Sequence, residues 1–141
     1  RPAYFPRKMP NALAILALNQ FRKLEKFNDH RKEIANFYFQ ELKNTAFELP
    51  LESEQAYLRF TVKHPKALEI IKKAWQRNLL LGDWYTHPVA PHDTKLNKVG
   101  YVAGSCPVAE KLTKQTFNLP THINISKKEA KEIISFLKTW K

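Results

Sequence analysis

Histidine, cysteine and carboxylate side chains are the residues of this sequence that could do chemistry. His87 and His92 flank a loop that contains prolines, and Asp93 follows the second histidine directly. Imidazole and carboxylate groups both bind zinc, but no third ligand stands at a spacing typical of a zinc site. The pattern therefore favours an exposed turn over a metal centre, and we predict no metal site.

The single cysteine, Cys106, is a candidate nucleophile. A thiol that precedes a helix can become more reactive, because the helix N-terminus stabilises its thiolate. Sequence spacing brings no histidine beside it, so we predict a small buried residue in front of Pro107 instead. No pair of carboxylates stands out either, and we assign no catalytic residue to the chain.

The composition excludes several classes of protein. Of the 141 residues, 43% are hydrophobic and 26% are charged, which is typical of a soluble globular domain. No apolar run approaches the roughly 20 residues of a membrane span, so we expect no membrane association. One cysteine allows no internal disulfide, which favours a reducing, cytoplasmic location. The three glycines are too dispersed for a phosphate-binding loop or a dinucleotide fingerprint.

The net charge of +11 raises the question of an anionic partner. The cations are 18 lysines and six arginines, and they are spread over every predicted helix. Many lysines alternate with glutamate, as around Glu129, Lys131 and Glu132, which is typical of a solvated helix face. Nucleic-acid modules use more arginine and more interleaved aromatic residues. Binding of a nucleic acid or another anion is therefore kept only as an alternative.

The N-terminal third predicts an extended segment and then one long helix. Residues 1–10 contain three prolines and are predicted to be an extended lead-in. Residues 11–44 lack proline and glycine and have an apolar face, which predicts a helix on the order of 50 Å long. A compact domain of this size is about 40 Å across, so the helix must bend or extend beyond the domain. Its apolar face consists of Leu13, Ala17, Leu24, Phe27, Ile34, Ala35, Tyr38 and Leu42.

Short strands and helices alternate in the rest of the chain. Residues 57–62 have the alternation of a strand, and 79–81 predict a second, buried strand that ends at Gly82. Ser126 and Glu129 have the spacing of a capping box at the start of the last helix. This order predicts an α/β (α+β-like) class, with a small, mostly antiparallel sheet covered by helices and a long N-terminal helix. Apart from the long helix, the predicted helices span 66–78, 107–117 and 127–140, and 83–104 is mostly loop.

Five short motifs in order resemble a known enzyme family. They are Met9-Pro10-Asn11 at the start of the long helix, Trp84-Tyr85-Thr86-His87-Pro88, Gly100-Tyr101-Val102-Ala103-Gly104, Pro107-Val108-Ala109-Glu110 and Asn118-Leu119-Pro120-Thr121-His122. Together they resemble the DegT/DnrJ/StrS family of fold-type-I aminotransferases, which use pyridoxal phosphate and act largely on keto sugars. The resemblance runs from about Met9 to the last helix.

The resemblance implies that residues 11–141 are the C-terminal, small domain of such an enzyme. The sequence starts at Arg1-Pro2-Ala3 without an initiator Met, so we expect a fragment of a longer chain. The family's large domain holds the Schiff-base lysine, which we expect upstream of this chain. Pyridoxal phosphate is thus expected in the parent protein and not on this chain alone. The implied partners are the large domain, a second copy in a homodimer, and a nucleotide sugar or other keto substrate.

The resemblance also implies site residues, with two departures. The family's Gly-Tyr-Asn-Tyr-Arg-Met segment, whose asparagine reaches the cofactor phosphate of the neighbouring subunit, is Tyr4-Phe5-Pro6-Arg7-Lys8-Met9 here. Pro6 replaces that asparagine, so the expected cofactor-binding residues are Arg7, Lys8 and Asn11. Ala90 stands where the family often has a substrate-facing histidine. The expected substrate-binding residues are Tyr85, His87 and His122.

These departures leave a second functional class open beside the aminotransferase. The parent could be a relative that has lost activity and serves as an aminotransferase-like interaction or sensor module. A Schiff-base lysine in the upstream sequence would distinguish the enzyme from such a module.

Overall fold

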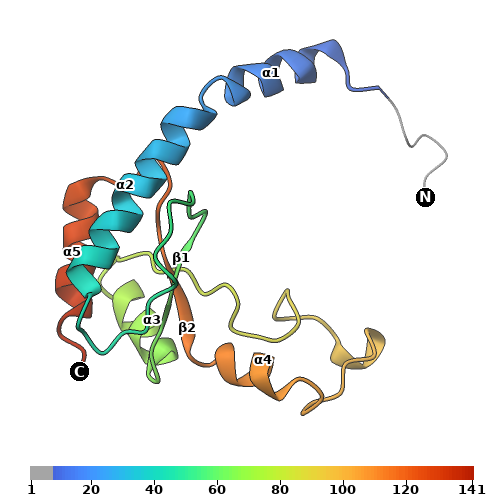
Figure 1. Cartoon of the computed structure of the whole chain (residues 1–141). Helices are drawn as coiled ribbons and strands as arrows, with labels where there is room; N and C mark the ends of the chain where they lie inside the picture. Colours follow the sequence, from blue (N-terminus) through green and yellow to red (C-terminus); the bar gives the residue numbers. More distant parts are fainter. Residues whose placement is uncertain (1–7) are drawn as a thin grey trace.

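The fold is built on a two-stranded antiparallel sheet, as the computed structural model of residues 8–141 shows (Figure 1). Strand β1 (Phe60–Lys63) pairs with β2 (Thr116–Leu119), so that Phe60 lies opposite Leu119 and Lys63 opposite Thr116. Single antiparallel bridges widen the pair on both sides, from Glu48 to Lys63 and from Gly82 to Asn118. The predicted class, with a small antiparallel sheet and covering helices, is confirmed.

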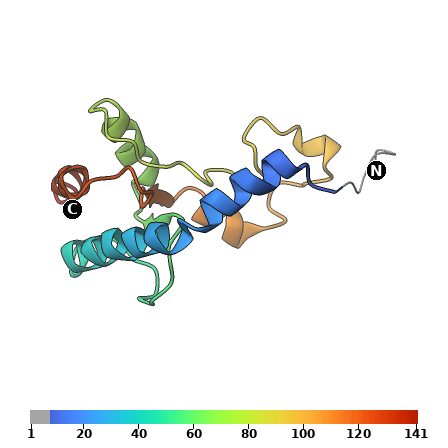
Figure 2. The ribbon, with the colours of Figure 1, turned by 90° about the horizontal axis from the view of Figure 1, so that it is seen from above.

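Helices from distant parts of the chain cover this sheet. The two longest in the body, α2 (Leu24–Leu42) and α5 (Lys127–Leu137), lie side by side in both views (Figures 1 and 2). Helix α3 (Ala67–Trp75) contacts β2 and buries Ala67, Ile70, Ile71 and Ala74. The predicted capping box is present at α5, where Ser126 Oγ accepts a hydrogen bond from Glu129 N (3.2 Å) and Ser126 N donates to Glu129 Oε2 (2.7 Å).

Aromatic side chains form the centre of the core between α2 and the sheet. The ring of Phe60 lies 4.8 Å from that of Phe39 and 5.5 Å from that of Tyr38. The buried Tyr38 hydroxyl donates to Pro120 O at 2.9 Å, which satisfies its polar group inside the core. Burial raises the pKa of Tyr38 far above its ordinary value. The end of α2 and the segment after β2 are thereby tied together.

Two predicted elements are shorter in the structure than the sequence predicted. The helix expected over 107–117 ends at Leu112 as α4 (Pro107–Leu112), because Phe117 is drawn into the core as part of β2. The strand expected over 79–81 is reduced to the single bridge at Gly82. Residues 83–106 are mostly irregular, as predicted, and contain one short 3-10 helix, η1 (Leu96–Lys98).

The predicted long helix is interrupted at residues 22–23. It forms α1 (Asn11–Phe21) and α2, separated by a turn in which Lys23 N bonds to Gln20 O (3.0 Å), a tighter i to i−3 hydrogen bond. Neither proline nor glycine marks this position, so the sequence did not locate the break. The predicted lead-in over 1–10 lies largely outside the described residues, and 8–10 carry no regular structure.

Helix α1 extends away from the body, as Figure 1 shows, and none of its residues is buried. The apolar side chains on it are strongly exposed, for example Leu16 at 62% and Phe21 at 70%. On α2, by contrast, Ile34, Ala35 and Tyr38 of the predicted face are buried. The prediction that the helix bends or extends beyond the domain is confirmed. None of the described helices has the combination of length and apolar character needed to cross a bilayer.

We expect the exposed apolar surface of α1 to make the chain self-associate or aggregate, because contiguous apolar surface of a few hundred Å² tends to find a partner. Added salt should strengthen association, since it screens the repulsion of a +11 chain. A Leu16→Glu variant should be more monomeric in sedimentation equilibrium, whereas Gln20→Glu, which adds the same charge at an exposed polar site, should change little. A chain that remains monomeric at low and high salt would contradict this expectation.

His64 should make stability depend on pH. Its side chain is 5% exposed, its Nδ1 accepts a hydrogen bond from Lys66 N (3.0 Å), and burial lowers its pKa from the ordinary 6.5. The unfolded state therefore takes up the proton at higher pH than the folded state, so stability is complete above 6.5 and is lost as the pH falls. Urea unfolding between about pH 7.5 and 5.5 should show this slope.

A His64→Asn variant offers the corresponding test, because its Oδ1 can replace Nδ1 as acceptor without titrating. The slope should flatten in this variant and persist in His92→Gln, which changes an exposed histidine. An unchanged slope in His64→Asn would assign the effect to other groups.

Candidate functional site

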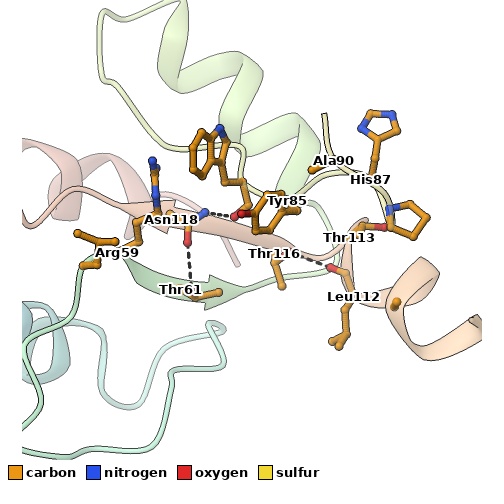
Figure 3. A pocket seen from close by; sticks show the side chains of 13 residues that line it. Arg59, Thr61, Tyr85, His87, Ala90, Leu112, Thr113, Thr116 and Asn118 are labelled. Atoms are coloured by element: carbon orange, nitrogen blue, oxygen red, sulfur yellow. Dashed lines mark hydrogen bonds between the residues drawn. The ribbon is translucent and has the colours of Figure 1, made fainter. Parts of the chain in front are cut away.

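A cavity of about 620 Å³ lies between the sheet and the segment that follows Gly82 (Figure 3). Arg59 and Thr61 reach it from the start of β1, and Asn118 reaches it from β2. Tyr85 and His87 come from the loop, with His87 at the far end of the cavity from Asn118 (Figure 3). The structure thus brings together two of the three residues expected to bind substrate. Ala90 also lines this cavity.

Asn118 fixes the loop against the sheet and is only 2% exposed. Its Oδ1 accepts from Thr61 Oγ1 at 2.9 Å, and its Nδ2 donates to the carbonyl oxygen of Trp84. Its main chain exchanges two hydrogen bonds of 2.8 Å with Gly82. A single buried amide therefore sets where the Trp84–Tyr85 backbone lies relative to the strands.

Aromatic rings and one cation form the wall beside this amide. The rings of Trp84 and Tyr85 are nearly parallel, with centroids 5.6 Å apart. The guanidinium carbon of Arg59 lies 4.0 Å from the centroid of the Trp84 ring, a cation–π contact. The wall is thus flat and aromatic with a positive charge at one end, and it suits a polar ring that carries negative charge.

The two loop histidines face a neighbouring cavity of about 340 Å³, with ring centroids 5.9 Å apart. Among residues 8–141, no three His, Cys, Asp or Glu side chains stand close enough together to hold a metal ion. The prediction for Cys106 was wrong, since the thiol is exposed. Cys106 precedes α4 at a point where the chain lies on the surface, so no neighbouring element covers it.

The other expected site residues lie elsewhere. His122 is exposed and lines a third cavity, of about 390 Å³, that shares Arg59, Trp84 and Asn118 with the first. Lys8 and Asn11 are exposed at the beginning of α1, on the arm that extends away from the body (Figure 1). Arg7 lies outside the described residues. Lys8 and Asn11 are therefore not part of the cavity that holds Tyr85 and His87.

Glu110 explains the spacing of the Gly100–Gly104 and Pro107–Glu110 motifs. Its carboxylate Oε1 accepts hydrogen bonds from the Tyr101 hydroxyl and from Gly104 N, both at 2.6 Å. These bonds lower the pKa of Glu110, and the bond to the carboxylate is the main reason that the pKa of Tyr101 is raised to about 12. The first turn of α4 thus closes the preceding loop into a defined shape.

Arg31 ties α2 to the segments before β1 and after β2. Its Nη1 donates to Leu58 O at 3.0 Å and to Thr121 Oγ1 at 3.3 Å. The lysines follow the expected surface pattern. Four of them form exposed pairs with glutamates, namely Lys63–Glu48, Lys73–Glu69, Lys127–Glu33 and Lys138–Glu41. This pairing supports a solvated surface over a nucleic-acid interface.

Sequence comparison identifies the family. The model of the DegT/DnrJ/EryC1/StrS aminotransferase family matches residues 5–138. The chain belongs to this family. A comparison with curated proteins finds no significant match.

Solved structures of family members and related enzymes show the same fold. A putative sugar aminotransferase, Spr1654 from Streptococcus pneumoniae in its pyridoxamine-phosphate form, matches 94% of this chain and 35% of its own, at 20% identity and a TM-score of 0.81. Bacillus subtilis NtdA with bound pyridoxamine phosphate matches 94% of this chain and 32% of its own, at 24% identity and a TM-score of 0.78. S. venezuelae DesV, in complex with a ketimine intermediate, matches 90% of this chain and 35% of its own, at 23% identity and a TM-score of 0.76. The chain spans about a third of the length of these structures.

Arg59, Thr61 and Asn118 are cavity residues that the sequence did not single out as functional. Asn118 was part of a family motif, but its role depends on Thr61, which is 57 positions away in sequence. Arg59 stood out only as a cation in a predicted strand. The contacts that give these residues a role arise from strand pairing, which the sequence pattern did not define.

Replacement of Asn118 should loosen the loop. An Asn118→Ala variant leaves the Trp84 carbonyl and the Thr61 hydroxyl without their partner, which should lower the free energy of unfolding by about 1–3 kcal/mol. Trp84 should also become more accessible to acrylamide quenching. Asn124→Ala, at an exposed loop position, is the matched control and should leave both measurements unchanged. Equal effects in the two variants would disprove the structural role of the Asn118 amide.

Proposed function

We propose that this chain is the C-terminal, small domain of a pyridoxal-phosphate-dependent aminotransferase that transfers an amino group to a keto sugar or a similar substrate. The observation that carries the proposal is the family match over residues 5–138 in a chain that spans about a third of the solved relatives. On this proposal, a large domain supplies the catalytic lysine, and the small domain helps to complete the active site. The single free cysteine suits a reducing, cytoplasmic setting.

The substrate would occupy the 620 Å³ cavity. Its volume and mixed lining are those of a small-molecule site, with aromatic rings and a few polar groups that orient the ligand. The hydroxyl of Tyr85 and the imidazole of His87 can each donate or accept a hydrogen bond to the hydroxyls of a sugar. Ala90 offers no such group, so recognition at that end would rest on His87 and its polar neighbours.

The residues at the beginning of α1 suit the phosphate of the cofactor. Lys8 offers an ammonium group and Asn11 an amide, and the first turn of α1 has no acidic residue and no side-chain cap on its N–H groups. All of these groups are donors, which is the chemistry that a phosphate needs. When bound, pyridoxal phosphate supplies the electron sink for amino transfer. Arg7, the residue before Lys8, would add a further donor to this set.

The expected cofactor-binding residues and the expected substrate-binding residues lie apart, which favours a site that two subunits share. Helix α1, which begins at Asn11, extends away from the body (Figure 1), and neither Lys8 nor Asn11 lines the cavity that holds Tyr85 and His87. We propose that the donors on α1 serve the cofactor of a partner subunit, while Tyr85 and His87 serve the substrate in their own subunit. The exposed apolar side chains of α1 would then be covered by the large domain and the partner.

The proposal predicts that the chain alone has no specific cofactor lysine. Equimolar pyridoxal phosphate followed by borohydride reduction should modify none of the 18 lysines stoichiometrically, because none of them is buried in a pocket that would favour a Schiff base. Mass spectrometry of the digested chain measures this directly. The same treatment of the parent protein should label one lysine outside these 141 residues. Stoichiometric labelling of one lysine within the chain would overturn the proposed division of roles.

A further inference from the structure

The cavity of about 390 Å³ beside the candidate site is lined by two arginines and a histidine, among other residues. Arg31 reaches it from α2, Arg59 from the residue before β1, and His122 from the segment after β2. The rest of its lining is apolar or neutral, and among the described residues no aspartate or glutamate lines it. A concave surface with charges of one sign attracts the opposite charge, so an anion is the ligand that this cavity favours.

Arg59 is held in place from two sides. Its guanidinium lies over the Trp84 ring at 4.0 Å. On the other side, a Cβ atom added to Gly82 would lie only 3.4 Å from Arg59 Nη1 and 3.2 Å from Asn118 Cβ. Glycine therefore makes room for the guanidinium and for the bridge to Asn118 at the same position. A positioned guanidinium loses less freedom when it binds a ligand than a mobile surface arginine would.

Arg31 and His122 present hydrogen-bond donors in defined orientations. In the described part of the chain, the hydrogen bonds of Arg31 use only Nη1, and a guanidinium has five N–H groups in all. Nδ1 of His122 accepts from Asn124 N at 3.3 Å, so its Nε2 carries a proton and can donate. Glu129 is the carboxylate whose charge interacts with His122, but it is engaged by the Ser126 side chain and main chain.

We infer that Arg31, Arg59 and His122 form a binding site for the phosphate or carboxylate group of a small molecule. Two guanidinium groups and an imidazole N–H can surround one oxyanion with directed hydrogen bonds, the arrangement that arginine favours. The inference goes beyond the proposed function, because this cavity is separate from the one assigned to the substrate. It can be tested without cofactor or turnover.

The test is an NMR titration of the 141-residue chain at low ionic strength, with inorganic phosphate in one arm and acetate in the other. Saturable shifts of the Trp84 indole signal, with the Trp140 indole unchanged, are expected. Saturation by phosphate alone supports a phosphate ester as ligand, and saturation by acetate supports a carboxylate. An Arg59→Gln variant should bind about tenfold more weakly or worse, since it loses a charged hydrogen bond.

Arg77→Gln is the matched control, because the substitution removes the same charge. The Arg77 guanidinium also lies over an aromatic ring, 5.3 Å from the centroid of Phe136. Two further variants separate geometry from charge. Gly82→Ala keeps every charge but crowds Arg59, and Arg59→Lys keeps the charge but loses the planar fork, so both should weaken binding severalfold. The inference is overturned if neither anion saturates, if Arg77→Gln weakens binding as much as Arg59→Gln, or if Arg59→Lys binds as well as the unchanged chain.

Discussion

The side chain of Asn118 is the constraint on which the site depends. It occupies the middle of β2, opposite Thr61, in a sheet of only two strands. Because the sheet fixes this residue, the hydrogen bond from its amide to the Trp84 carbonyl transmits the geometry of the strands to a loop that has no regular structure. A buried amide can do this only if both its oxygen and its nitrogen have partners, and Thr61 and Trp84 supply them.

The molecule divides into a well-packed body and two extensions. Among residues 8–141, the buried hydrophobic residues all lie at or after Ile34, and they gather between α2, α3, α5 and the sheet. Helix α1 contributes none of them, and neither does the loop over residues 83–106. Both extensions lie on the same side of the body in Figure 1. Segments with so few buried contacts are the ones that open first in a native protein, so a covering partner would stabilise them more than the body.

Local patterns in the sequence predicted the elements that local interactions define. The capping box of Ser126 and Glu129 and the apolar face of α3 need only neighbours within a few residues. The extent of α4 was wrong because Phe117 is placed by the core and not by helix propensity. The break between α1 and α2 was missed because neither proline nor glycine marks it, and the residues on both sides of it are exposed.

Only the site residues that belong to a recognisable motif could be predicted from the sequence. Tyr85 and His87 were expected from a single short motif, and the structure places both at one cavity. Arg59 and Asn118 were missed as a pair, because their roles require Gly82, Trp84 and both strands to meet. His122 was expected at the same site as Tyr85 but lines a separate cavity.

The two cavities are coupled by the residues that they share. Arg59, Trp84 and Asn118 line both, so an occupant of one would act on the wall of the other. An anion that draws the Arg59 guanidinium toward His122 would change its stacking on Trp84, and Trp84 in turn is stacked on Tyr85. A ligand with a polar ring in the larger cavity and an anionic group in the smaller one would satisfy both at once.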